Sequence, residues 1–257
     1  MEEKIFFENS NNYFTFVSKS YEESPLAVIV PGGGYNHTSK REAFNVADYF
    51  ISLGFHACVL NYRETLDLYP TPQKELAYVI DYFRENAKKY NILADKILNI
   101  GFSAGAHLVL SQSIYHSEFG KNSLPNLLVL CYPVVSSADS IAHKGSFEYL
   151  LKDTSNSNLL DKLSLEKHVT KELPDIFMWH TETDNSVNIM NSLKLYEAFI
   201  KNNVSCEYHV FDYGVHGMSL ADESMTTGGT NLKDDYIANW TRYLKNWLKL
   251  KGFVSND

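Results

Sequence analysis

The residues with the clearest chemical potential form a Gly-Phe-Ser-Ala-Gly motif at residues 101–105. An apolar stretch at residues 96–100 leads into this motif, and a helix-forming stretch at residues 106–111 leads out of it. A serine placed between a strand and a helix in this way is typical of a nucleophile held on a tight, strained turn. The flanking glycines let the strand and the helix pass close to each other without Cβ clashes. The motif therefore predicts Ser103 as a nucleophile, and a Gly/Ser-rich turn without chemistry is the alternative.

A serine hydroxyl needs a base that accepts its proton, and His216 is the best candidate among the nine histidines. It belongs to the segment Asp-Tyr-Gly-Val-His-Gly at residues 212–217, just past the last predicted strand. His180, near the end of a predicted strand, is its main rival. His107 lies in the helix after the serine, where we expect it to face packing or solvent.

The base needs a carboxylate that orients it, and the loop at residues 181–187 supplies two candidates. Asp184 is expected to face His216 from the adjacent strand. Glu182 is the runner-up, because it lies closer to the strand end and is expected to point away. We therefore predict Asp184 as the acid.

An oxyanion would need backbone donors, and a run of three glycines follows the first core strand at residues 32–34. Successive glycines allow N–H groups to turn toward a bound carbonyl without side chains in the way. We predict Gly33 and Gly34 as donors, joined by the N–H of Ala104 at the start of a helix. Phosphate binding is the alternative, but neither a Gly-Lys-Ser/Thr ending nor a third glycine at dinucleotide spacing is present.

Three further side chains follow these motifs closely enough to line a substrate pocket, namely Tyr35, His37 and Tyr62. No cluster of histidines and carboxylates has the spacing of metal ligands, so we expect no metal and no cofactor.

Strand and helix patterns alternate regularly along the chain. A continuous apolar run at residues 25–30 is typical of a strand covered on both faces, and further strands are predicted at residues 55–60, 96–100, 127–131, 175–180 and 206–211. An aromatic run at residues 13–17 is interpreted as an edge strand. Helical spacing of apolar residues marks residues 41–53, 72–90, 187–202 and 233–250, with Thr71 expected as an N-cap before Pro72.

This alternation predicts one α/β domain over residues 1–257, built on a doubly wound, mostly parallel sheet with helices on both faces. Ligands of such sheets bind beyond the carboxyl ends of the strands, where all of the candidate residues are expected. Residues 136–172 are polar, with short apolar clusters, and predict a small, lid-like helical excursion over that end of the sheet.

Composition excludes several other classes of function. The chain has 257 residues, of which 44% are hydrophobic, and a formal net charge of −8. Without a basic run we expect no nucleic-acid partner, and without a long apolar run we expect no membrane span. The acidic N-terminus lacks the apolar core of a signal peptide, so a cytoplasmic location is expected. Three scattered cysteines are expected to serve in apolar packing, and the oligomeric state is left open.

Taken together, these motifs resemble the α/β-hydrolase esterases over about residues 25–250. The order of Ser103, Asp184 and His216 matches the nucleophile, acid, base order of that fold. The nearest group is the acetyl-esterase and acetylxylan-esterase-like hydrolases, which are related to the lipases and esterases with a His-Gly-Gly-Gly motif. This chain has Pro31 where the latter group has histidine, and we expect no counterpart of that group's long N-terminal helical cap.

The resemblance implies a serine carboxylesterase that acts on small, acetyl-type esters, with acetylated sugars among the expected substrates, through an acyl-enzyme and without a cofactor. The implied partner is a small-molecule ester. Two alternatives are a serine peptidase of short peptides on the same fold and a non-catalytic binding protein with a hydrolase fold.

Overall fold

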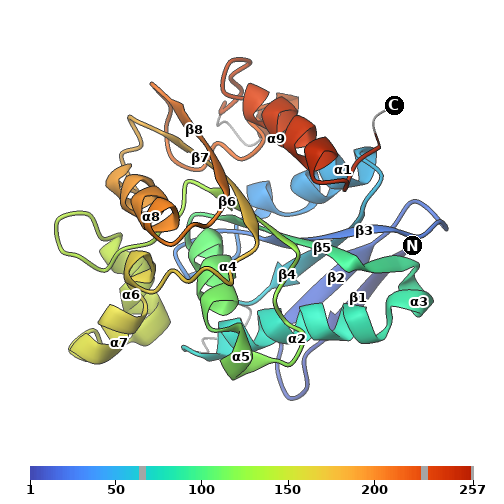
Figure 1. The fold of residues 1–257 in the computed structure, drawn as a ribbon, viewed down its shortest axis with the longest axis horizontal. Helices are drawn as coiled ribbons and strands as arrows, with labels where there is room; N and C mark the ends of the chain where they lie inside the picture. Colours follow the sequence, from blue (N-terminus) through green and yellow to red (C-terminus); the bar gives the residue numbers. More distant parts are fainter. Residues whose placement is uncertain (64–67, 227–230, 256–257) are drawn as a thin grey trace.

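A computed structural model describes residues 1–63, 68–226 and 231–255 of the chain (Figure 1). Its described part forms one sheet of eight strands in the order β1-β2-β4-β3-β5-β6-β7-β8. The strands are β1 Glu2–Phe6, β2 Tyr13–Val17, β3 Ser24–Val30, β4 His56–Asn61, β5 Ile92–Phe102, β6 Leu127–Cys131, β7 Asp175–Thr181 and β8 Cys206–Phe211. All neighbours from β4 to β8 pair in parallel, whereas β1 and β2 are antiparallel additions. The predicted doubly wound, mostly parallel sheet is confirmed.

One prediction about the edge of the sheet is wrong. Strand β2 pairs with β1 on one side and with β4 on the other, so β1 is the edge strand. The first three residues of β1 are charged, and its burial alternates between exposed and half-buried. Such a short, charged strand suits an edge, since the charges discourage pairing with other chains.

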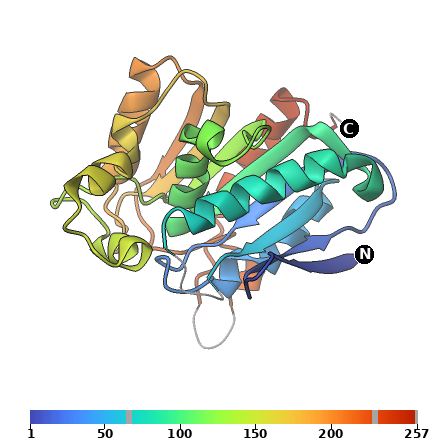
Figure 2. The same ribbon diagram turned by 90° about the horizontal axis from the view of Figure 1, so that it is seen from below.

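Helices cover both faces of the sheet (Figures 1 and 2). On one face lie α1 (Phe44–Ser52) and α9 (Asn239–Leu250), and on the other lie α2 (Thr71–Glu85), α4 (Ala104–Ile114) and α8 (Met190–Lys201). Two short helices, α3 (Ala87–Tyr90) and α5 (His116–Phe119), follow α2 and α4.

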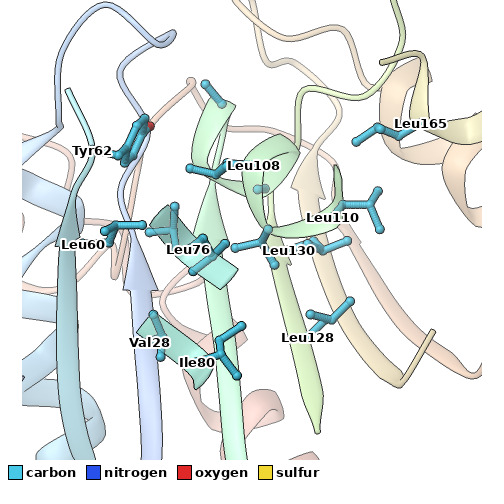
Figure 3. Close-up of a cluster of buried hydrophobic side chains, with 14 of the residues drawn as sticks. Val28, Leu60, Tyr62, Leu76, Ile80, Leu108, Leu110, Leu128, Leu130 and Leu165 are labelled. Atoms are coloured by element: carbon cyan, nitrogen blue, oxygen red, sulfur yellow. The ribbon is translucent and has the colours of Figure 1, made fainter. Parts of the chain in front are cut away.

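The sheet separates two apolar cores because its side chains alternate between the two faces. Val28 of β3 belongs to the same apolar core as Leu76 of α2 and Leu108 of α4 (Figure 3). Its neighbour Ile29 faces the other way, into the core that contains Trp240 of α9. This two-sided burial explains why the parallel strands are continuous apolar runs rather than alternating ones.

Local signals at helix ends were less reliable. Helix α2 begins at Thr71, so Pro70 occupies the N-cap position and Thr71 makes no capping hydrogen bond. The prediction of Thr71 as the cap is therefore wrong by one position. The last helix was predicted to begin at residue 233 but begins at Asn239. The intervening residues form a short turn, in which the Asp234 side chain accepts the N–H groups of Tyr236 and Ile237.

Residues 136–172 form a helical segment next to α8, which we call the excursion segment (Figure 1). It contains α6 (Lys144–Leu151), α7 (Ser157–Lys162) and a 3₁₀ turn at Leu165–Lys167. Its apolar side chains, such as Phe147 and Leu150, join the core of α2 and α4, so it packs on the body of the sheet. Among the described helices, none has both the length and the apolar character to cross a membrane.

Candidate active site

Ser103 sits on a strained turn between β5 and α4. Its φ is 54° and its ψ is −119°, a conformation that L-residues rarely adopt. A Cβ on Gly101 would lie 2.5 Å from the carbonyl oxygen of Gly105, and one on Gly105 would lie 2.1 Å from that of Val30. Neither approach leaves room for a side chain. The two glycines of the motif are therefore required for β3, β5 and α4 to come this close together.

The structure brings the predicted nucleophile, base and acid into one series of hydrogen bonds. Ser103 Oγ lies 2.9 Å from His216 Nε2, and His216 Nδ1 lies 2.6 Å from Asp184 Oδ2. Because the carboxylate accepts, Nδ1 carries the proton and Nε2 is left to accept the serine proton. These three hydrogen-bonded residues follow β5, β7 and β8, which lie far apart in the sequence.

The Asp184 carboxylate is held from both sides. Its Oδ1 accepts the backbone N–H groups of Ser186 and Val187 at 2.8 and 2.9 Å. Its Oδ2 accepts from His180 Nε2 at 3.1 Å as well as from His216. Burial raises the pKa of this carboxyl, but the hydrogen bonds from the two histidines and from Val187 outweigh burial and hold the pKa below its ordinary value. Asp184 is thus a fixed negative charge beside the base.

The rival residues occupy other positions. His180 is fully buried and bonds to Asp184 and to the Ser192 hydroxyl, and burial lowers its pKa. Glu182 is exposed at the surface. His107 is buried under the site, where it accepts from the Tyr35 hydroxyl and donates to the Leu163 carbonyl. Of these three side chains and His216, it is His216 that hydrogen-bonds to the Ser103 hydroxyl.

Residues 32–34, which we call the glycine turn, follow β3 and face the space in front of Ser103. Gly33 and Gly34 border the cavity in front of Ser103 and have φ values of 117° and 62°. Within the described residues, their N–H groups have no hydrogen-bond acceptor. Ala104 is fully buried at the first position of α4, directly after the serine. These positions are compatible with the predicted oxyanion donors, whose role remains a proposal.

A cavity of about 320 Å³ opens in front of Ser103 and His216. Its other lining residues are mostly polar and come from the segment between the glycine turn and α1, from the excursion segment and from the loops after β7 and β8: Asn36, His37, Ser39, Arg41, Glu42, His143, Gly145, Tyr149, Ser186 and Gly217. His37 lies in the wall, as predicted. The described residues contain no group of three His, Cys, Asp or Glu side chains arranged to hold a metal ion.

Two of the predicted pocket residues lie elsewhere. Tyr35 and Tyr62 are buried beneath the glycine turn rather than in the cavity wall. Tyr35 bonds to His107, and the Tyr62 hydroxyl donates to the Pro31 carbonyl at 2.7 Å. Their rings pack edge to face, with centroids 5.9 Å apart. Both tyrosines therefore support the turn from inside the core, and the prediction that they line the pocket is corrected.

Several residues in the wall were not identified from the sequence. His143 and Tyr149 come from the excursion segment, whose polar composition gave no signal for individual side chains. Burial and the nearby His216 lower the pKa of His143. Glu42 was also missed, because nothing in the sequence around Arg41 and Glu42 indicates that this carboxylate is buried.

Comparisons with known proteins agree with this fold and site. The BD-FAE family model matches residues 15–127. The endo-1,4-beta-xylanase B of Butyrivibrio fibrisolvens is 28% identical over 248 residues, covering 88% of this chain and 39% of that protein. The acetylxylan esterase of Xylanibacter ruminicola is 28% identical over 227 residues, covering 86% of this chain and 45% of that protein. The chain thus spans less than half the length of these two curated relatives.

Among solved structures, the acetyl ester-xyloside bifunctional hydrolase from Caldicellulosiruptor lactoaceticus is 33% identical and superimposes with a TM-score of 0.85. The match covers 96% of this chain and 91% of the other. The sheet order, the helices on both faces and the strand–Ser103–helix turn define the α/β-hydrolase fold. Within that fold, the chain belongs to the esterases.

Proposed function

We propose that the protein is a serine carboxylesterase that hydrolyses small, acetyl-type esters through an acyl-enzyme. The observation that carries the proposal is the unbroken chain from Ser103 Oγ through His216 to Asp184, which ends in an open cavity opposite a glycine turn. Such a chain supplies a nucleophile, a base and an orienting charge in a single geometry.

In the proposed reaction, Ser103 Oγ attacks the ester carbonyl while His216 Nε2 accepts its proton. The carbonyl electron pair moves onto the oxygen, which the N–H groups of Gly33, Gly34 and Ala104 stabilise. The C–O bond to the alcohol then breaks, and the alcohol leaves with the proton from His216. Water attacks the acyl-enzyme by the same route, which releases the acid and restores the serine.

The chemistry of the cavity supports a small and polar ester. Its walls carry His37, Arg41, His143 and Tyr149, which can hydrogen-bond to hydroxyl-rich alcohols. The names of two relatives, an acetylxylan esterase and an acetyl ester-xyloside hydrolase, support acetylated sugars as the substrate class. The excursion segment contributes His143, Gly145 and Tyr149 to the cavity wall, so it helps to shape the space for the alcohol.

The test compares hydrolysis of p-nitrophenyl acetate, butyrate and octanoate with that of an aminoacyl p-nitroanilide. We expect the acetate to be the best substrate and the amide to be cleaved poorly. Ser103→Ala should lower kcat by about 10⁴-fold or more. Ser113→Ala is the matched control, because that hydroxyl lies in α4, which begins directly after Ser103, and donates to the Val109 carbonyl away from the cavity.

Full activity of Ser103→Ala would refute the proposed nucleophile. Faster cleavage of the amide than of the acetate would replace the esterase with a peptidase. Absence of turnover on every ester, together with binding of acetylated sugars, would favour a non-catalytic binding protein.

A further inference from the structure

Glu42 is a buried carboxylate beside the active site that the proposed reaction does not use. It ends the 3₁₀ turn Lys40–Glu42 before α1, and only 3% of its surface is exposed. It also borders the catalytic cavity. A buried carboxylate is costly unless hydrogen bonds satisfy it, so its contacts indicate what it does.

Both oxygens of Glu42 accept hydrogen bonds from segments that carry the site. Oε2 accepts the N–H of Gly32 at 2.8 Å, and Oε1 accepts the hydroxyl of Tyr132 at 2.7 Å. The Tyr132 oxygen in turn accepts the N–H of Ser219 at 3.0 Å. A continuous path of three hydrogen bonds therefore joins the glycine turn after β3 to the segment that follows His216.

The first end of this path fixes the glycine turn. The N–H of Gly32 is held by Glu42, and its carbonyl oxygen accepts the N–H of Ser39 at 3.1 Å. Because a peptide unit is planar, fixing the Gly32 carbonyl also fixes the direction of the Gly33 N–H. A Cβ at Gly32 would lie 2.9 Å from Glu42 Oε2 and 3.0 Å from the Cβ of Ser103, so glycine is needed for both approaches.

The second end fixes the base. The ring of Tyr132 packs edge-on against the ring of His216, with centroids 5.0 Å apart. Tyr132 and Ser219 both have positive φ, at 39° and 51°, and non-glycine residues keep such a conformation only where surrounding contacts hold it. The hydroxyl of Tyr132 connects these two strained positions, because it accepts the N–H of Ser219 and donates to Glu42.

We propose that Glu42 is a positioning residue that sets the distance between the glycine turn and His216, acting through Tyr132. The inference rests on the proposed function, because the glycine turn matters for catalysis only if it holds an oxyanion. A carboxylate suits this role because it accepts at both oxygens. A glutamine in its place would turn an NH₂ group toward one of the two donors and break one of the two connections.

The test measures kcat, KM and thermal midpoint for Glu42→Gln, Tyr132→Phe and the double variant, with p-nitrophenyl acetate as the substrate. Each single variant should lower kcat by about tenfold, because a misplaced donor or base costs transition-state stabilisation, while KM changes by less than about threefold. The double variant should be no slower than the slower single variant, because both changes break the same path.

Glu166→Gln is the matched control. That carboxylate also accepts two hydroxyl groups, from Ser136 and Ser164, but it lies in the excursion segment away from the cavity wall. It should lower the thermal midpoint with little change in kcat. If Glu42→Gln keeps wild-type kcat, or if the effects of the two single variants multiply in the double variant, the inference is wrong.

The two proposals fail in different ways. The proposed esterase function is refuted if Ser103→Ala is active or if the wild-type protein is inactive. Loss of the positioning role would appear as an active wild type, an inactive Ser103→Ala and an unaffected Glu42→Gln.

Discussion

Replacing Asp184 with asparagine should stop the proposed reaction by changing the proton on His216. The side chain of Asp184 is fully enclosed and accepts four hydrogen bonds, two from backbone N–H groups at Oδ1 and two from histidines at Oδ2. An asparagine of the same shape has one oxygen and one NH₂ group. Its lowest-cost orientation keeps the oxygen on the two backbone donors and turns the NH₂ group toward His216.

An NH₂ group in that place is a donor that faces Nδ1 at the 2.6 Å contact, so Nδ1 must become an acceptor. The proton then resides on Nε2, which can no longer accept the proton of Ser103. A comparable change of tautomer in serine hydrolases costs about 10⁴-fold in kcat, which corresponds to about 5 kcal/mol in the activation barrier. We therefore expect a loss of this size for Asp184→Asn.

The assay is steady-state hydrolysis of p-nitrophenyl acetate at pH 8, with circular dichroism to verify that the variant is folded. Glu182→Gln is the control, because it removes a nearby but exposed carboxylate and should keep wild-type activity. If folded Asp184→Asn stays within tenfold of the wild type, the orientation argument is wrong. If Glu182→Gln is the inactive variant, the two carboxylates have been assigned in reverse.

Two further predictions concern stability. Burial lowers the pKa of His107 to about 4, so the unfolded chain binds a proton at this residue between pH 6.5 and 4 while the folded chain does not. Folding stability should therefore decrease by up to about 3 kcal/mol from this residue as the pH falls through that window, and His107→Gln should have a flatter pH dependence in urea denaturation. Equal slopes for the two proteins would contradict this. Gly105→Ala places a Cβ 2.1 Å from the Val30 carbonyl oxygen and should abolish soluble expression, whereas Gly145→Ala, whose Cβ would have its nearest contact at 3.9 Å, should express normally.

The parts of the site that lie next to each other along the chain were predictable from local patterns. The turn around Ser103 needs glycines at two fixed positions, and a sequence shows such spacing directly. Asp184 and His216 were also identified, since each follows a predicted strand and the carboxyl ends of parallel strands share one edge of the sheet. The geometry brings these residues together, although their catalytic roles await the experiments above.

Contacts between distant segments were not predictable. Glu42, Tyr132 and Ser219 carry no motif, and their connection depends on how three separate loops pack. Tyr35 and Tyr62 were assigned to the pocket because they adjoin the motifs, but a tyrosine can turn its ring into the core when its hydroxyl finds a buried partner, as both do. Sequence proximity to a site does not determine the side on which a side chain lies.

The cavity is bordered both by residues at the strand ends and by residues of the excursion segment, and this has a consequence for the effect of substitutions. Ser103, Asp184 and His216 lie at the ends of β5, β7 and β8, and the hydrogen bonds between them fix their side chains. His143 and Tyr149 reach the same cavity from the excursion segment. If the proposed esterase reaction is right, we expect substitutions in that segment to alter which ester fits while Ser103, His216 and Asp184 keep their geometry. We therefore expect ester preference to respond to changes in the excursion segment, whereas turnover itself should depend on the residues at the strand ends.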